Sequence, residues 1–123
     1  MPFNDYRDLD VWQVSMDLAI DCYRSSSSFP NDERYGLTSQ LRRAAVSVPA
    51  NIAEGYGRYT TKSYLYHLSV SSGSLKEVET HLLIARRLQY LAEKDIEPLF
   101  SLTSRVGRML TALRRSLESN RIE

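Results

Sequence analysis

The sequence predicts an all-α protein, an antiparallel up-and-down four-helix bundle. Its apolar residues recur at steps of three and four instead of alternating, which is the period of amphipathic helices. Only five glycines and four prolines occur among the 123 residues, and few turn signals are therefore available to separate short strands. Short connections between the periodic segments favour antiparallel neighbours. We expect one domain over residues 1–123, with helices over about 8–27, 32–55, 61–91 and 94–119.

The first two helices are predicted from apolar stripes. The stripe of the first helix consists of Leu9, Trp12, Met16, Ala19 and Tyr23. The stripe of the second consists of Leu37, Leu41, Ala44, Val48 and Ile52. Polar residues 31–33 suit the N-terminus of the second helix, because they can bond to its free amide groups. Gly55 or Gly57 is expected to end it with a left-handed cap.

The third and fourth helices carry longer stripes. That of the third helix consists of Leu68, Ser71, Leu75, Val78, Leu82 and Ala85. That of the fourth consists of Leu99, Leu102, Val106, Leu110, Leu113 and Leu117. Further apolar residues lie off these stripes, namely Leu83, Ile84, Leu88, Phe100 and Met109. They indicate either self-association through a wide apolar surface or a broad core-facing stripe.

Charge and composition exclude several protein classes. The formal net charge is +1, so a general nucleic-acid coat is excluded and any polyanion site must be local. The longest stretches without a charged residue, 63–75 and 44–53, are shorter than the roughly 20 residues of a membrane span. The acidic, aromatic start does not resemble a signal peptide. Together with the single cysteine, Cys22, these features predict a cytoplasmic protein.

Arginine is concentrated at the C-terminal end. Residues 101–123 hold five Arg and two Glu, whereas residues 1–30 hold five Asp and two Arg. The predicted fourth helix carries Arg105, Arg108 and Arg115 on one face, with Arg114 and Arg121 on an adjoining face. One interpretation is a track for the RNA backbone, because arginine binds phosphate in a bidentate manner. The other is a solvated face that pairs with the acidic first helix of the same or a neighbouring subunit.

The second predicted helix contains Pro49, which removes a backbone hydrogen bond and is expected to kink the helix. The neighbouring Asn51 and Glu54, with Arg43, either form a polar pocket or have a structural role, in which they satisfy groups freed by the kink or pair across an interface. Four tyrosines follow among cations, at positions 56, 59, 64 and 66. They suit base stacking or a protein interface.

No pattern indicates catalysis, a metal site or a cofactor. A di-iron bundle requires Glu-x-x-His on two helices, and this chain has none; Glu77 and His81 are four residues apart, as in an ordinary helix-surface pair. Cys22 is interpreted as a small, partly buried side chain. The sequence has no glycine-rich phosphate loop and no nucleophile with an identifiable base. We expect a protein that is not an enzyme.

Several segments together resemble one bacterial family. They are YRDLDVW from Tyr6, Phe29-Pro30, ERYGL from Glu33, QLRRAAVSVPANIAEG from Gln40 to Gly55, SGSLKE from Ser72, His81, and Met109-Leu110. With these segments the chain resembles the ribosomal-RNA intervening-sequence proteins, which are small four-helix bundles first noticed as reading frames inside 23S rRNA genes. The resemblance covers nearly the whole chain.

The resemblance implies a homopentameric ring of four-helix protomers. A similar fold occurs in the accessory variability determinant of diversity-generating retroelements, which works with a reverse transcriptase and nucleic acid through a strongly basic surface. The implied partners are therefore further copies of the chain, together with structured RNA, a ribonucleoprotein or a nucleic-acid enzyme. The resemblance assigns structural or subunit-contact roles, and no catalytic role, to Arg42, Arg43, Pro49, Asn51, Glu54 and Gly55. The alternative is a protein-interaction scaffold without nucleic-acid binding.

Overall fold

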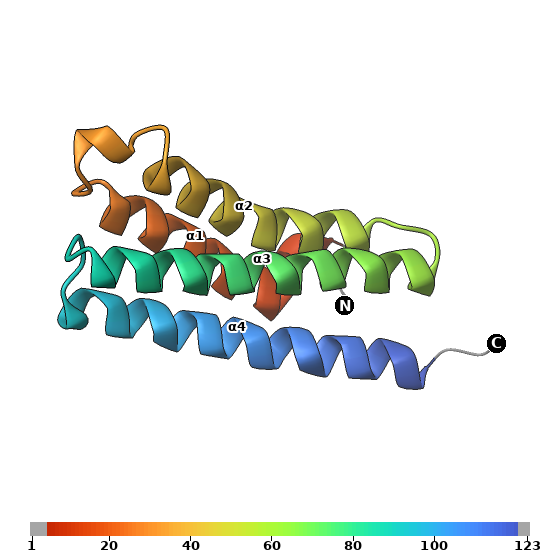
Figure 1. The fold of residues 1–123 in the computed structure, drawn as a ribbon. Helices are drawn as coiled ribbons and strands as arrows, with labels where there is room; N and C mark the ends of the chain where they lie inside the picture. The colour runs from red at the N-terminus through yellow and green to blue at the C-terminus, as the bar shows by residue number, and fades with distance from the viewer. Residues whose placement is uncertain (1–4, 121–123) are drawn as a thin grey trace.

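The computed structural model describes residues 5–120, and within that range it contains four α-helices and no strand. Helix α1 spans Asp10–Ser26, α2 Leu37–Tyr56, α3 Thr61–Arg87 and α4 Glu93–Ser119. Short 3-10 helices occupy Tyr6–Asp8 (η1) and Asn31–Glu33 (η2). The helices lie side by side, with the α2–α3 connection at one end and the other two connections at the opposite end (Figure 1). Helix α3 packs against both α2 and α4.

One apolar core runs between the four helices. The predicted stripes of α2 and α3 are buried in full, and in α4 Leu99, Val106 and Leu110 are buried while Leu102 is half-buried. The largest side chains that are almost completely buried are Leu18, Leu41, Ile52, Leu68, Leu75, Leu82, Ile96, Leu99 and Leu110. Burying each such side chain contributes about 1.5–3 kcal/mol, so this core is the main source of stability.

The stripe predicted for the first helix is only partly buried, although Leu9 and Trp12 pack against the core. Helix α1 buries Val11, Val14, Leu18 and Cys22, whereas of the predicted residues only Ala19 is buried and Tyr23 is 42% exposed. Both sets recur at steps of three and four, and they occupy neighbouring faces of the same helix. The predicted set contains both aromatic side chains of the helix, Trp12 and Tyr23. That second apolar face is half-exposed in the structure.

Helix α2 begins five residues later than predicted, because Glu33 caps the helix from outside it. Glu33 Oε1 accepts a hydrogen bond from the Leu37 amide at 3.0 Å, and Oε2 accepts one from the Tyr90 hydroxyl at 2.8 Å. A Cβ atom on Gly36 would lie 2.7 Å from Glu33 Oε1. Glycine at this position therefore makes room for the capping side chain.

The ends of α2 and α3 also differ from the prediction. Gly57 follows α2 with a φ of −83°, and Gly55 lies within the helix, so neither forms a left-handed cap. Helix α3 ends at Arg87 instead of about residue 91, because Gln89 adopts a φ of 64°. The Tyr90 amide then donates a hydrogen bond to the Ala85 carbonyl at 2.8 Å, which closes the helix end.

Candidate nucleic-acid interface

An open groove of about 710 Å³ lies between α3 and α4. Leu75 and Gly107 form part of its lining, together with Thr103, which is buried. Hydroxyl and charged groups complete it, namely Ser72, Lys76, Glu79, Ser104, Arg108, Thr111, Arg114 and Arg115. A groove that combines cations and hydroxyl donors with some apolar lining suits an extended anionic ligand.

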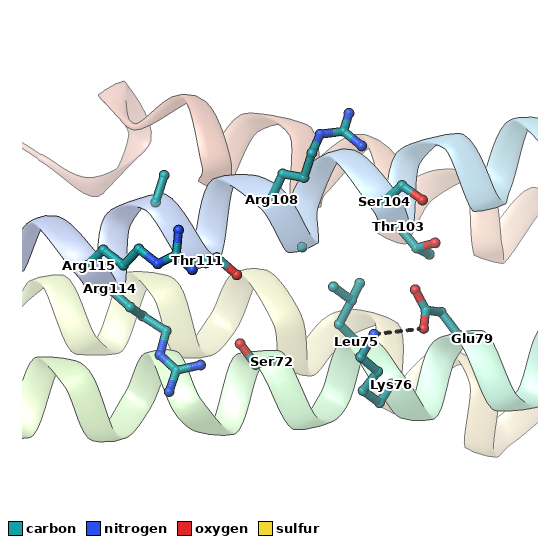
Figure 2. A pocket seen from close by; sticks show the side chains of 12 residues that line it. Ser72, Leu75, Lys76, Glu79, Thr103, Ser104, Arg108, Thr111, Arg114 and Arg115 are labelled. Atoms are coloured by element: carbon teal, nitrogen blue, oxygen red, sulfur yellow. Dashed lines mark hydrogen bonds and ion pairs between the residues drawn. The ribbon is translucent and has the colours of Figure 1, made fainter.

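Helix α4 supplies three arginines to this groove. Arg108 and Arg115 are seven residues apart and therefore lie on one face of the helix. Arg114 is half-buried and is directed toward α3 in Figure 2, whereas Arg108 points away from α3. None of the three guanidinium groups makes a hydrogen bond or an ion pair with a described residue. All three are therefore free to bind a ligand.

The other charges of the groove do not neutralise these arginines. Lys76 donates a hydrogen bond to Glu79 at 3.3 Å, and the two opposite charges offset each other. The groove thus carries an excess of three positive charges on a chain whose formal net charge is +1. Any polyanion site on a chain of this net charge must be local, and this groove is the candidate for it.

The structure separates the five arginines that the sequence grouped together. Arg108, Arg114 and Arg115 line the groove, whereas Arg105 is exposed on α4 and does not line it. Arg121 lies outside the described residues. None of the four described arginines makes an ion pair with α1 of the same chain.

The opposite side of α3 packs closely against α2, and polar side chains bond to each other there. His67 Nδ1 lies 3.1 Å from Asn51 Oδ1, and His67 Nε2 lies 3.8 Å from a carboxylate oxygen of Glu54. Glu54 also pairs with Arg58. Asn51 and Glu54 therefore belong to a polar cluster that joins the two helices. The sequence did not show that His67 belongs to this cluster, because its partners come from another helix.

Gly55 allows α2 and α3 to approach at this contact. A Cβ atom on it would lie 2.9 Å from His67 Cβ and 3.3 Å from the Tyr64 carbonyl oxygen. Pro49 is buried within α2, and next to it the Val48 carbonyl accepts a hydrogen bond from the Ser71 hydroxyl at 2.9 Å. A side chain of α3 thus bonds to the backbone of α2 beside the proline.

The paired arginines Arg42 and Arg43 have different surroundings. Arg42 donates hydrogen bonds to Ser26 Oγ at 2.9 Å and to the Tyr23 carbonyl at 3.1 Å, and its guanidinium lies 4.7 Å from the centre of the Tyr23 ring. It therefore attaches α2 to the end of α1. Arg43 is exposed and lines a separate depression with Glu77 and His81, so it does not join Asn51 and Glu54 in one pocket.

The four clustered tyrosines divide into two pairs. Tyr56 and Tyr64 pack edge to face at 6.2 Å, and burial raises the pKa of Tyr64 to about 12. Tyr59 is fully exposed and Tyr66 is 63% exposed. Only the second pair is available to a ligand or partner.

Cys22 is completely buried, which exceeds the predicted partial burial. Burial, with a smaller contribution from Asp21, raises the pKa of its thiol to about 12, so the reactive thiolate is scarce at neutral pH. Among residues 5–120, no three His, Cys, Asp or Glu side chains come together as a metal site. No helix in that range is long and apolar enough to cross a membrane.

Comparison with known proteins identifies the family. The family model described as "23S rRNA-intervening sequence protein" matches residues 7–112. The chain belongs to this family. The resemblance predicted from the sequence segments is thereby confirmed. No curated protein matches the chain.

A solved structure supports the fold of this family member. The chain is similar to a protein of unknown function from the S23 ribosomal protein family of Bacteroides thetaiotaomicron, with 18% sequence identity and a TM-score of 0.76. The match covers 85% of this chain and 97% of the other. At this identity the likeness concerns the fold alone, and in the described residues of this chain all regular secondary structure is helical.

Proposed function

We propose that this chain is a non-catalytic homo-oligomer that binds structured RNA through the groove between α3 and α4. The observation that carries the proposal is the excess of three unpaired arginines in the groove, at positions 108, 114 and 115. Family membership supports RNA as the ligand, since the family takes its name from an intervening sequence in 23S rRNA.

The groove suits the phosphates of an RNA backbone. Arginine binds phosphate oxygens through two parallel N–H groups, and nearby hydroxyls add neutral donors. Ser72, Ser104 and Thr111 provide such hydroxyls on both walls. Arg105 extends the positive charge along α4 in this proposal, beyond the groove itself, and Arg121, which lies outside the described residues, is proposed to contribute further positive charge.

The proposed assembly is a homopentameric ring of antiparallel four-helix bundles, each formed by the single domain of one chain. Exposed apolar side chains support self-association: Ile20, Tyr23, Val46, Leu83, Ile84 and Leu88 are 37–50% exposed. A ring would present several copies of the groove to one RNA, which raises affinity without new contacts. A nucleic-acid enzyme that acts on the same RNA is the proposed protein partner.

The test is RNA affinity after removal of the groove charges. A variant with Arg108, Arg114 and Arg115 all changed to Gln is expected to bind a structured 23S rRNA fragment at least tenfold more weakly in near-physiological salt. Filter binding or fluorescence anisotropy measures the change. Circular dichroism and light scattering establish that the variant keeps its fold and its oligomeric state.

The matched control removes three positive charges elsewhere. Arg24, Arg86 and Arg87 do not line the groove, and the first two already pair with Asp21 and Glu93. Changing these three to Gln is expected to weaken binding by less than about threefold. Equal losses in the two triple variants would show that net charge acts, and not the groove.

The second candidate is a protein-interaction scaffold that binds no nucleic acid. The near-neutral net charge and the exposed apolar side chains favour it. It predicts that the intact oligomer fails to bind RNA even in low salt, and that nuclease treatment of a lysate leaves the recovery of a protein partner unchanged.

A further inference from the structure

A second depression, of about 450 Å³, lies between α2 and α3. Its lining is almost entirely polar and includes Tyr35, Gln40, Arg43, Glu77 and His81. Small-molecule sites have volumes of about 300–1,000 Å³, so a single nucleotide fits this space. Neither the family description nor the similar structure assigns a role to it.

Intramolecular contacts leave several groups of the depression unused. The side chains of Arg43 and Glu77 are exposed and make no hydrogen bond or ion pair with a described residue. His81 Nδ1 is shielded from solvent and has no hydrogen-bond partner. Unsatisfied polar atoms are rare in folded proteins, and each one requires an explanation. The polar cluster around Asn51 differs, because its members bond to each other.

An aromatic ring stands at the same depression. Tyr35 is 86% exposed, and the Arg34 guanidinium lies 5.4 Å from the centre of its ring. An exposed tyrosine is an effective platform for base stacking, and neighbouring arginines suit the phosphate that accompanies the base.

We infer that this depression binds one unpaired nucleotide of the RNA. The base stacks on Tyr35, the phosphate binds Arg43, and the Glu77 carboxylate accepts a hydrogen bond from an amino group on the base edge. Because uracil has no amino group, the site favours guanine, cytosine or adenine over uracil. The inference rests on the proposed function, because it adds a preference for certain bases to the proposed binding of RNA.

The two sites flank the same helix. Lys76 of α3 lines the α3–α4 groove, and the next residue, Glu77, lines the α2–α3 depression. An α-helix with its side chains is about 10–12 Å wide, so one RNA that crosses α3 reaches both sites. The groove binds backbone phosphates, and the depression adds recognition of an unpaired base.

The experiment compares an RNA hairpin that has a single-stranded loop with a blunt duplex of the same stem. Tyr35→Ala is expected to weaken hairpin binding by about 5- to 150-fold, the usual range for one lost stacked base. Arg43→Gln is expected to weaken it as well, because this substitution removes the phosphate contact. Both variants should leave duplex binding within twofold. Arg87→Gln is the matched control, because it removes one exposed positive charge that lines neither site.

A titration with mononucleotides separates this inference from the proposed function. Guanosine monophosphate is expected to shift NMR signals of Tyr35, Arg43 and Glu77 in the wild-type protein and in the groove triple variant alike. Uridine monophosphate should shift them less, and Glu77→Gln should reduce the difference.

Three results would overturn the inference. The first is that Tyr35→Ala weakens binding of the hairpin and binding of the duplex by the same factor. The second is absence of shifts at the depression while groove-dependent RNA binding persists; this removes the inference and leaves the proposed function intact. The third is a change of oligomer size in Arg43→Gln or Tyr35→Ala, which assigns the depression to a contact between subunits. If the wild-type protein bound no RNA but guanosine monophosphate still shifted the NMR signals of the depression, the proposed function would be rejected and the inference would stand.

Discussion

The two sides of α3 make opposite use of similar residue types. Toward the middle of the α2 contact, Ser47 and Ser74 bond at 2.7 Å, and Asn51, Glu54 and His67 form a cluster. Toward α4, the arginines at 108, 114 and 115 line an open groove and make no ion pair with a described residue. A polar group that is satisfied within the chain stabilises the fold, whereas one that is left free can bind another molecule.

The same distinction applies to arginines that are adjacent in the sequence. Arg42 has two hydrogen bonds and a stacked ring, and Arg43 has none of these contacts. Residue type and neighbourhood in the sequence therefore do not separate arginines that bond within the fold from arginines that make no bond to a described residue. The contacts do.

The strongest way to break the α2–α3 contact is to enlarge Gly55. Gly55→Ala places a Cβ atom 2.9 Å from His67 Cβ, so the helices must move apart. We expect a loss of about 1–2 kcal/mol in the free energy of unfolding, since overpacking costs about 1–3 kcal/mol and the gain in helix propensity offsets part of it. Urea denaturation followed by circular dichroism measures this loss.

Gly73 provides the matched control on the same helix pair. It is exposed in α3, and a Cβ atom there would meet nothing within 4 Å. Gly73→Ala should therefore stabilise the protein by about 0.5–1 kcal/mol through helix propensity. If both substitutions stabilised the protein, the close approach at Gly55 would be wrong.

A smaller effect is expected from a pair of arginine substitutions. Arg42→Gln removes two hydrogen bonds and a cation–π contact, and it should lower the free energy of unfolding by about 1 kcal/mol. Arg108→Gln should change stability by less than about 0.5 kcal/mol, because its side chain makes no hydrogen bond or ion pair with a described residue. RNA affinity should respond in the reverse order. If Arg42→Gln and Arg108→Gln changed the free energy of unfolding equally and also changed RNA affinity equally, the distinction between the two arginines would be wrong.

The smallest effect concerns Glu33, and it is present near neutral pH and lost at acid pH. The Leu37 amide, followed by the Tyr90 hydroxyl, lowers the pKa of Glu33 from its ordinary value of 4.5. Since the folded-state pKa is lower than the unfolded one, the stabilisation is present above the unfolded value and is lost as pH falls through the folded value. Glu33→Gln should thus be less stable than the wild type near neutral pH, and this difference should shrink on acidification.

Thermal unfolding of both proteins between pH 7 and pH 3 measures that difference. A difference that stays constant over this range would show that ionised Glu33 does not cap α2. Tyr90→Phe offers a check on the second partner, because it removes the hydroxyl and leaves the Leu37 contact in place.

Much of this fold could be predicted from residue spacing, and the exceptions have physical causes. The stripes of α2 and α3 are unambiguous, because each helix has one continuous apolar face in the core. Helix α1 has two apolar faces with the same spacing, and the period alone does not decide which one is buried. Capping by Glu33 depends on a side chain that folds back across Gly36, which periodicity does not reveal.

The candidate site could be predicted only in part. Helix geometry places Arg108 and Arg115 on one face of α4, but it does not say which neighbour faces them. Arg105 was grouped with them and lies outside the groove, since the position of α3 defines the groove. The α2–α3 depression and the contacts of His67 depend on the relative register of two helices, which a single sequence does not contain.

The central claim is that three groove arginines bind RNA phosphates, and its most direct test is the salt dependence of binding. For each phosphate contact, the slope of log affinity against log salt concentration changes by about 0.7–0.9. Replacement of Arg108, Arg114 and Arg115 by Gln should therefore make this slope about 2–3 units shallower than in the wild type. A slope that matches the wild-type value in a folded, fully assembled variant would contradict the assignment of the groove.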